Sequence, residues 1–241
     1  MPVTLELGGK SPMIVLDDAD LPRAIAGAVA GMRFTRQGQS CTAASRMLVH
    51  RSLHAPSSEG LVEAVNALRM GDPLDEATDI GTIISPAQFR RVQRYIALGR
   101  ARKARRATRV QRAPPRSPPG QRLLRPARHL HGPAQRPPPL QEEIFGPVTC
   151  VLPFDDYEEA IALANDTDFG LAATIWTNNL QRALDAVHRL QAGFVQVNQN
   201  LVVQPTLAYG GYKQSGIGKE ASLGAMLDHF THAKTVLINR V

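Results

Sequence analysis

The stretch that decides the fold is SPMIVLDDADLPRAIAGAVAGM, residues 11–32. Its first part, residues 11–18, is a short apolar run of the kind that forms a buried strand. A helix is then predicted from Asp20, an N-cap residue, with Pro22 in the first turn and apolar side chains at helical spacing: Ile25, Ala28, Val29 and Met32. The stretch therefore predicts a buried strand followed by an amphipathic helix.

The same alternation continues along most of the chain. Further strands are predicted at residues 46–50, 147–154, 171–177, 194–198 and 235–239. Further helices are predicted at residues 58–72, 85–99, 156–166, 179–193 and 221–230. Short apolar strands that alternate with amphipathic helices indicate an α/β fold with a mostly parallel, doubly wound sheet covered on both faces.

The charge of the chain is concentrated in one segment. The 241 residues carry a formal net charge of +7, but residues 100–136 contain 11 arginines and Lys103. The rest of the chain has 16 basic against 21 acidic residues, so the basic character does not describe the whole surface. Nucleic acid is therefore not an expected partner of the patterned parts.

Residues 100–140 interrupt the pattern. Nine prolines lie between Pro114 and Pro139, and they exclude a continuous helix or central strand. Three interpretations remain open: a stretch translated out of frame, a proline-rich linker, or a basic arm that binds nucleic acid or a partner. The chain accordingly divides into residues 1–99, the irregular segment 100–140, and residues 141–241.

The low number of cysteines and the absence of long apolar runs indicate the cellular compartment of the protein. Cys41 and Cys150 form no zinc-binding spacing, and so few cysteines favour a reducing compartment, by default the cytoplasm. No secretory leader and no membrane span are expected. His229 and His232 are three residues apart but lack a third ligand, so no metal site is predicted.

Cys41 lies among small residues in GQSCTAASR, residues 38–46. A cysteine attacks as its thiolate, and small neighbours allow backbone N–H groups and a substrate to approach the sulfur. The alternative is a buried cysteine that only fills the core, which is the interpretation we give Cys150. Near the amino terminus, Glu6 lies in TLELGGKS, residues 4–11, where a confined carboxylate would suit a general base.

Four motifs in order resemble those of the aldehyde dehydrogenase superfamily. They are LELGGK at residues 5–10, GQSC at 38–41, EEIFGP at 142–147 and GGYKQSGIGKE at 210–220. The resemblance covers the chain except residues 100–140. It implies the catalytic domain of that family.

The resemblance also implies a mechanism. Cys41 would attack an aldehyde to form a thiohemiacetal, with its own N–H holding the oxyanion, and hydride transfer would leave a thioester. Glu6 would activate the water that hydrolyses this thioester to the acid. The implied cofactor is NAD or NADP, with Glu143 on the ribose hydroxyls, Phe145 beside the nicotinamide ring, and Leu7 and Gly8 near that ring.

The sequence departs from the family at several points. The amino-terminal cofactor domain is missing, together with the asparagine that completes the oxyanion hole, so we expect the chain alone to have little or no activity. The closing residues 232–241 resemble a strand that pairs with a neighbouring subunit, which implies a homo-oligomer for the intact parent. The apolar run 200–208, at the substrate entrance, favours an apolar or aromatic aldehyde. A non-catalytic remnant and an arginine-rich binding protein are the alternative functions.

Overall fold

The computed structural model describes residues 3–101, 127–128, 138–200 and 206–239. The central element is a six-stranded sheet in the order β4-β5-β3-β2-β7-β8, in which every neighbouring pair is parallel. Its strands are β2 (Pro12–Val15), β3 (Arg46–His50), β4 (Ala127–Arg128), β5 (Cys150–Phe154), β7 (Ala172–Trp176) and β8 (Phe194–Val197). The predicted parallel α/β sheet is confirmed.

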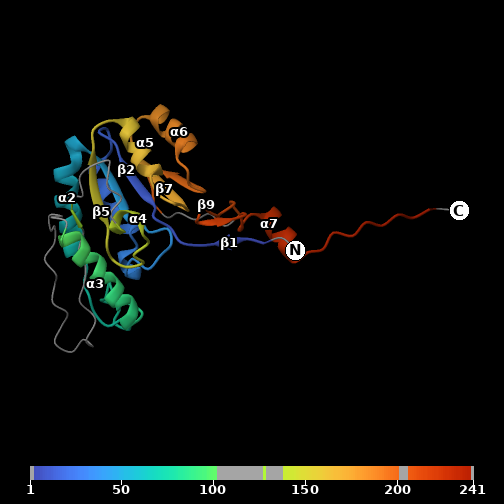
Figure 1. Cartoon of the computed structure of the whole chain (residues 1–241), viewed down its shortest axis with the longest axis horizontal. Coiled ribbons are helices and arrows are strands. Elements are labelled where there is room, and N and C mark those ends of the chain that lie inside the picture. The colour runs from blue at the N-terminus through green and yellow to red at the C-terminus, as the bar shows by residue number, and fades with distance from the viewer. Residues whose placement is uncertain (1–2, 102–126, 129–137, 201–205, 240–241) are drawn as a thin grey trace.

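Helices cover both faces of this sheet (Figure 1). Side chains alternate along β2, so Met13 and Val15 pack with α1 (Leu21–Gly31) and α2 (Arg51–Asn66) on one face. On the other face, Ile14 and Leu16 pack with α5 (Tyr157–Asn165) and α6 (Leu180–Arg189). The sheet is therefore buried on both sides, which explains why its strands are apolar runs.

The local signals that predicted the first helix are present in the structure. The Asp20 carboxylate accepts a hydrogen bond from the Arg23 backbone N–H, so Asp20 caps α1 as expected. The prediction for α2 was wrong at both ends, because the helix begins at Arg51 and ends at Asn66 instead of spanning 58–72. The His50 ring caps its first turn, and Pro56 is tolerated inside the helix on the exposed side.

A third cluster lies beside the main sheet. Helix α3 (Pro86–Ala101) begins after Ser85, whose hydroxyl accepts from the Gln88 N–H. Its buried side chains pack on the loop before β5, in a cluster of Val92, Tyr95, Ile96, Ile144 and Val148. This contact fixes the segment that carries the EEIFGP motif.

Most of the arginine-rich segment 100–140 lies outside the described residues. In the part that is described, the two-residue strand β4 pairs with β5, and the short helix α4 (Pro138–Gln141) begins at a proline. Proline suits the first turn of a helix, where its missing N–H has no intrahelical partner. The interpretations of the rest of this segment stay untested.

Short elements connect the sheet to the amino-terminal strand. The pairs β1 (Leu5–Glu6) with β10 (Gly216–Ile217) and β6 (Phe169–Gly170) with β9 (Tyr212–Lys213) are antiparallel. A 3-10 helix, η1 (Phe34–Arg36), precedes the GQSC motif. These pairings place the last motif beside the first.

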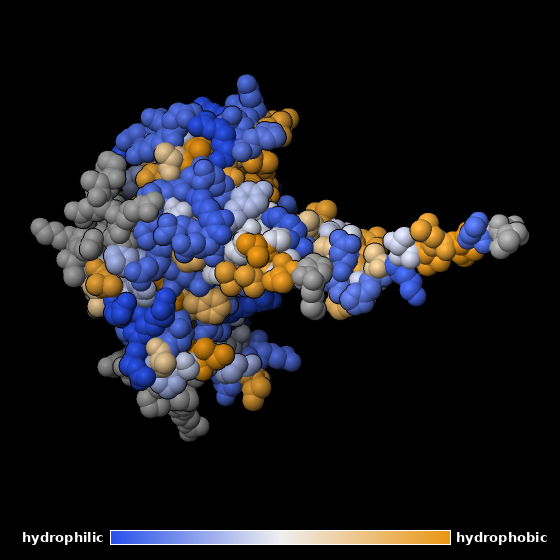
Figure 2. All heavy atoms as spheres, turned by 45° about the vertical axis from the view of Figure 1, so that its right-hand side comes forward, coloured by the Kyte–Doolittle hydropathy of each residue, from blue (hydrophilic) through white to orange (hydrophobic). Residues whose placement is uncertain are grey.

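The carboxyl-terminal residues extend away from the body of the molecule (Figures 1 and 2). After α7 (Leu223–Phe230), residues 231–239 form no helix or strand, so the strand predicted at 235–239 is absent. Leu237 and Ile238 are 93% and 84% exposed. A strand forms only when its backbone groups have a partner, and residues 231–239 lie in no ladder within the described parts of the chain. The expected pairing with a second subunit stays a prediction.

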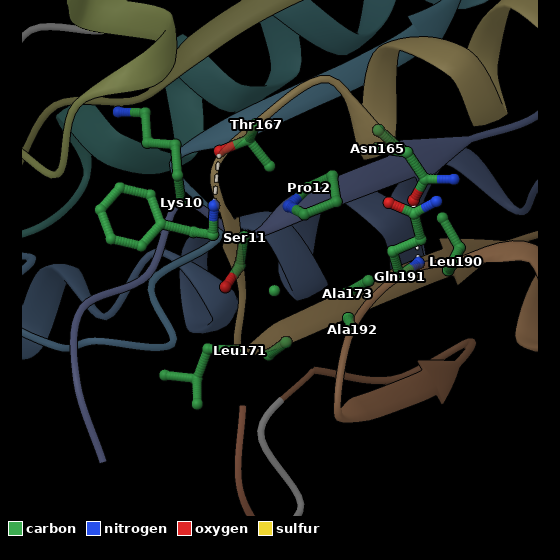
Figure 3. A pocket seen from close by; sticks show the side chains of 14 residues that line it. Lys10, Ser11, Pro12, Asn165, Thr167, Leu171, Ala173, Leu190, Gln191 and Ala192 are labelled. Carbon is green, nitrogen blue, oxygen red and sulfur yellow. Dashed lines mark hydrogen bonds between the residues drawn. The ribbon is translucent and has the colours of Figure 1, made fainter. Parts of the chain in front are cut away.

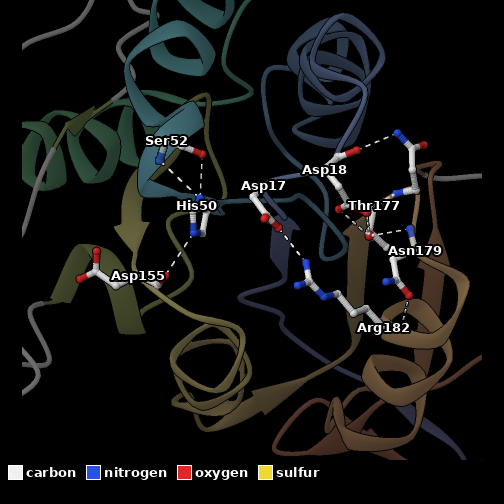
Figure 4. Close-up of polar contacts among 9 residues, drawn as sticks. Asp17, Asp18, His50, Ser52, Asp155, Thr177, Asn179 and Arg182 are labelled. Atoms are coloured by element: carbon white, nitrogen blue, oxygen red, sulfur yellow. Dashed lines mark hydrogen bonds and ion pairs between the residues drawn. The ribbon is translucent and has the colours of Figure 1, made fainter.

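Polar side chains tie the carboxyl ends of the strands together (Figure 4). Asp18, after β2, accepts hydrogen bonds from Thr177 Oγ1 after β7 at 2.7 and 2.9 Å. Asp17 forms an ion pair with Arg182 of α6, and His50 bonds the Asp155 carbonyl. The polar groups at this edge are thus engaged with one another, and the predicted site residues lie elsewhere.

Candidate active site

The predicted site residues gather at the amino edge of the sheet. Glu6 precedes β2, Cys41 precedes β3, and Glu143 precedes β5. Because these strands are parallel, the loops before them meet at one edge. Ligands of open α/β sheets generally bind at the carboxyl ends instead, so the location could not be inferred from strand order alone.

Cys41 is half-buried, whereas Cys150 is buried in the core and its Sγ contacts the Pro139 carbonyl. Burial and the nearby Glu143 carboxylate raise the pKa of the Cys41 thiol. Three donors act in the opposite direction: the N–H groups of Cys41 and Thr42, and the Tyr209 hydroxyl. The sulfur therefore has a set of groups ready to stabilise its anion, although the resting thiol is favoured.

The glycine pair of LELGGK makes close contacts with both Cys41 and Glu143. The Gly9 N–H donates a hydrogen bond of 3.0 Å to Glu143 Oε1. A Cβ atom on Gly9 would lie 2.1 Å from the Cys41 carbonyl oxygen, and one on Gly8 would lie 2.8 Å from Glu143 Oε2. At Gly9 the neighbouring atom is backbone, so only glycine permits this approach; at Gly8 the neighbouring atom is the end of the Glu143 side chain.

Glu6 lies against the loop of the last motif. A Cβ atom on Gly210 would lie 3.1 Å from Glu6 Oε1. Although Glu6 as a residue is exposed, partial burial of its carboxyl raises the pKa, the Glu220 charge raises it further, and Lys219 lowers it. Tyr209 interacts electrostatically with both Glu6 and Cys41. The Tyr209 hydroxyl thus bonds the Cys41 sulfur, and the charge of Glu6 acts on Tyr209 as well.

Leu7 and Phe145 remain at the surface. Leu7 is 48% exposed and Phe145 is 39% exposed. Phe145 has a φ of 55°, and its carbonyl accepts a 2.7 Å hydrogen bond from the Gln88 side chain of α3. Of the six predicted residues, Gly8, Cys41 and Glu143 are in one cluster, Glu6 lies against Gly210 of the last motif, and Leu7 and Phe145 present apolar surface.

Sequence reasoning missed the residues that support this cluster. Buried Arg46 donates to the carbonyls of Lys10, Leu163 and Ala164, and so connects β3 to the LELGGK segment and to the end of α5. Tyr209 and Lys219 lie within or beside the last motif, but nothing in their spacing indicated that they approach Cys41 and Glu6. Their contacts depend on the pairing of β1 with β10. Strands of two residues give no pattern that could be recognised in a sequence.

Two small hollows lie near the site but not at the sulfur. One is lined by Lys10, Ser11, Thr167, Leu171 and neighbouring side chains, and the Lys10 amine points away from it (Figure 3). None of Cys41, Glu6 and Glu143 lines it. The second reaches Thr42, the residue after Cys41, together with Gly31, Phe194 and Asn200. Only the second therefore offers space next to the predicted nucleophile.

The sequence profile of the aldehyde dehydrogenase family matches residues 1–236. The chain belongs to the aldehyde dehydrogenase family. Betaine aldehyde dehydrogenase 2 of Rhizobium meliloti (strain 1021) is 42% identical over 239 residues, which are 99% of this chain and 48% of the relative. Betaine aldehyde dehydrogenase of Brucella abortus (strain S19) is 41% identical over 246 residues, covering 98% and 48%.

Solved structures of aldehyde dehydrogenases have the same fold as this chain. The NAD⁺ complex of an aldehyde dehydrogenase from Bacillus cereus has a TM-score of 0.88 and 39% identity, covering 99% of this chain and 47% of that one. A mutant of P. syringae indole-3-acetaldehyde dehydrogenase in complex with NAD⁺ and IAA has a TM-score of 0.88 and 40% identity, covering 96% and 46%. This aldehyde dehydrogenase chain therefore spans about half the length of the relatives it matches. Within the described residues, no helix is long and apolar enough to cross a membrane.

Proposed function

We propose that this chain carries the catalytic part of an enzyme that oxidises an aldehyde to a carboxylic acid with NAD or NADP. Family membership supports the reaction class. The observation that carries the assignment is the set of donors around Cys41: its own N–H, the Thr42 N–H and the Tyr209 hydroxyl. A cysteine that only packs in the core, such as Cys150, does not react as a thiolate, so donors aimed at its sulfur would serve no reaction.

In the first step, the Cys41 thiolate attacks the aldehyde carbon. A C–S bond forms, and the electron pair of the carbonyl bond moves to oxygen. The Cys41 N–H stabilises this oxyanion, and protonation gives a thiohemiacetal. The half-buried position of Cys41 suits this role, because the sulfur is reachable yet partly withdrawn from water.

The residues present fit the nicotinamide half of the cofactor. Gly8 has no side chain, so the space beside Glu143 stays open. One oxygen of the Glu143 carboxylate accepts from Gly9, and the other can accept hydrogen bonds from the two hydroxyls of a ribose. Leu7 and Phe145 offer exposed apolar surface for a planar ring. When bound, the cofactor supplies a hydride acceptor. Transfer of hydride to it, with loss of the hydroxyl proton of the adduct to water, would leave the acyl group on Cys41 as a thioester.

In the last step, Glu6 acts as general base. Its carboxylate takes a proton from water, the water oxygen attacks the thioester carbon, and the C–S bond breaks to release the acid and the Cys41 thiolate. Partial burial and Glu220 raise the pKa of Glu6 and so make it a stronger base than an ordinary glutamate. Glu6 lies against Gly210, the residue after Tyr209, whose hydroxyl bonds Cys41.

We propose a broader class of substrate than the names of the relatives specify. Those names specify betaine aldehyde, which is cationic, and indole-3-acetaldehyde, which is aromatic. The apolar run 200–208 favours an apolar or aromatic aldehyde, although residues 201–205 lie outside the described residues. We also propose that the 241 residues alone act slowly on aldehydes, since their relatives are about twice as long.

An activated ester tests the roles of Cys41 and Glu6 without cofactor. With p-nitrophenyl acetate, we expect a first turnover of p-nitrophenol that Cys41→Ser abolishes and the matched control Cys150→Ala retains. Glu6→Gln should keep this first turnover and slow the later ones by roughly 100-fold to 10,000-fold, the usual contribution of a general base. Survival of the first turnover in Cys41→Ser would exclude Cys41 as the nucleophile.

A further inference from the structure

Lys219 is held in a fixed position between two backbone carbonyls. Its Nζ donates to the Gly210 carbonyl at 2.5 Å and to the Gly193 carbonyl at 3.2 Å. The same ammonium lies 4.8 Å from the centre of the Tyr212 ring, a cation–π distance. A lysine on a surface loop is normally mobile, so these contacts indicate that its charge has a defined place.

Two glycines give Lys219 this place and bring Glu6 to the same spot. A Cβ atom on Gly193 would lie 2.5 Å from Lys219 Nζ. A Cβ atom on Gly210 would lie 3.1 Å from Glu6 Oε1 and 3.2 Å from Lys219 Cδ. The carboxylate of Glu6 and the side chain of Lys219 therefore both lie against the Cα of Gly210.

Among the described residues, Lys219 is the cation that acts on Glu6, and Glu220 is the opposing anion. The charged and titratable groups that face Glu6 are Glu220, Lys219 and Tyr209. Burial and Glu220 favour the protonated form of Glu6, and Lys219 favours the ionised form. Burial lowers the pKa of Lys219, and the Glu6 charge acts in the opposite direction by favouring the ammonium.

We propose that Lys219 is a positioning residue that keeps Glu6 ionised and in place beside Gly210 against the opposing charge of Glu220. This inference rests on the proposed function, in which Glu6 is the general base. A base must be deprotonated to accept a proton from water, so Lys219 would extend the action of Glu6 to lower pH. Lys219 itself touches no reacting atom.

The test follows the ionisation of Glu6 directly. The carboxyl carbon of Glu6 is observed by ¹³C NMR in the labelled full chain, assigned by its loss in Glu6→Gln, and titrated with pH. Two neutral variants, Lys219→Gln and Lys219→Met, should move the Glu6 midpoint to higher pH, whereas Lys219→Arg should keep it near that of the unaltered chain. The Lys219→Gln variant keeps a side-chain N–H donor for the two carbonyls, so it should retain more of the native stability than Lys219→Met.

Lys213 supplies the matched control. It lies in strand β9 of the same motif and also donates to two backbone carbonyls, those of Asn165 and Thr167, at 2.8 and 3.0 Å. Lys213→Met removes an equal charge and should leave the Glu6 midpoint unchanged. An unchanged midpoint in a folded neutral Lys219 variant, or an equal shift in Lys213→Met, would overturn the proposal.

A second readout separates this inference from the proposed function. In the ester assay, the acid limb of the later turnovers should move to higher pH in Lys219→Gln, while the first turnover keeps its rate. If Glu6→Gln leaves the later turnovers unaltered, the general-base role fails. The NMR midpoint still tests the effect of the Lys219 charge on Glu6 in that case, because it uses neither substrate nor cofactor.

Discussion

The Gly9 backbone N–H donates a 3.0 Å hydrogen bond to Glu143 Oε1, and so joins two loops that are 134 residues apart in the chain. On the same residue, a Cβ atom would lie 2.1 Å from the Cys41 carbonyl oxygen. Gly9 therefore sets the distance between the predicted nucleophile and the predicted cofactor ligand. A change at this one backbone position should disturb both.

Gly9→Ala is expected to destabilise the chain by about 1–3 kcal/mol, the usual cost of overfilling a close contact. The displaced Cys41 loop should also make the thiol more accessible. Chemical denaturation followed by the fluorescence of Trp176 measures the first effect. The control is Gly224→Ala in α7, where the added Cβ meets no atom within 4 Å and should leave stability unchanged or improve it by about 0.5–1 kcal/mol. Equal stability of the two variants would contradict the close approach at Gly9.

Glu143→Gln should make Cys41 more reactive near neutral pH. The Glu143 charge raises the pKa of the Cys41 thiol, so its removal lowers that pKa and increases the thiolate fraction. Glutamine can still accept the Gly9 hydrogen bond through its side-chain oxygen. The measurement is the rate of iodoacetamide alkylation of Cys41 against pH, by peptide mass spectrometry, with buried Cys150 as the slow internal reference.

Glu142→Gln is the matched control for this alkylation experiment. Glu142 is adjacent in sequence, but its carboxylate accepts from the Tyr95 hydroxyl in the α3 cluster. The Cys41 rate should not change in this variant. A faster rate in both variants would attribute the effect to general loss of negative charge instead of to Glu143.

Tyr209→Phe should have the opposite effect on Cys41. The Tyr209 hydroxyl lowers the pKa of the thiol, so its loss should raise that pKa and slow alkylation near neutral pH. The phenyl ring keeps its edge-to-face contact with Phe194, at 5.6 Å between centroids, which protects the fold. Tyr157→Phe, which removes a hydroxyl bonded to Asp185 between α5 and α6, serves as control. An unchanged rate in Tyr209→Phe would remove Tyr209 from the site.

The elements with strong local signals could be predicted from the sequence. The strand at residues 12–15 is a short apolar run, and α1 and α3 each begin at a residue that caps the helix through its side chain. The start of α2 could not be predicted, because a proline usually marks the beginning of a helix. Pro56 instead lies inside α2, with its ring on the exposed side. The strand expected at 235–239 needs a partner that the local sequence does not supply.

The site was predictable only in part. The motifs pointed to Cys41, Glu6, Gly8 and Glu143, and the structure brings Cys41 and Glu143 into contact distance of the glycine pair Gly8–Gly9. The roles of Tyr209, Lys219 and Arg46 could not be predicted, because each depends on where a distant loop lies. Arg46 illustrates this: its three carbonyl partners lie 36 to 118 residues away in the chain.

Lys10 is expected to lower the stability of the folded chain at neutral pH. Its side chain is 1% exposed, and its Nζ has no hydrogen-bond partner within the described residues. Burial lowers the pKa of this amine from 10.5 to about 8, with Arg46 acting in the same direction and Cys150, Glu143 and Glu142 against it. Below about pH 8, the folded state therefore carries a buried charge that the unfolded state keeps in water.

Lys10→Met should accordingly stabilise the chain at pH 7. At about 1.4 kcal/mol for each pH unit, the lowered pKa corresponds to a gain of about 3 kcal/mol. As pH rises from about 8 to 10.5, the Lys10 amine loses its proton in the folded chain before it does so in the unfolded chain, so the unaltered protein becomes more stable. The difference in stability between Lys10→Met and the unaltered protein therefore becomes smaller. Urea denaturation of both proteins at a series of pH values measures this, with Lys234→Met in the exposed tail as control. A gain that is absent at pH 7, or that does not narrow on the alkaline side, would show that the buried amine finds a partner.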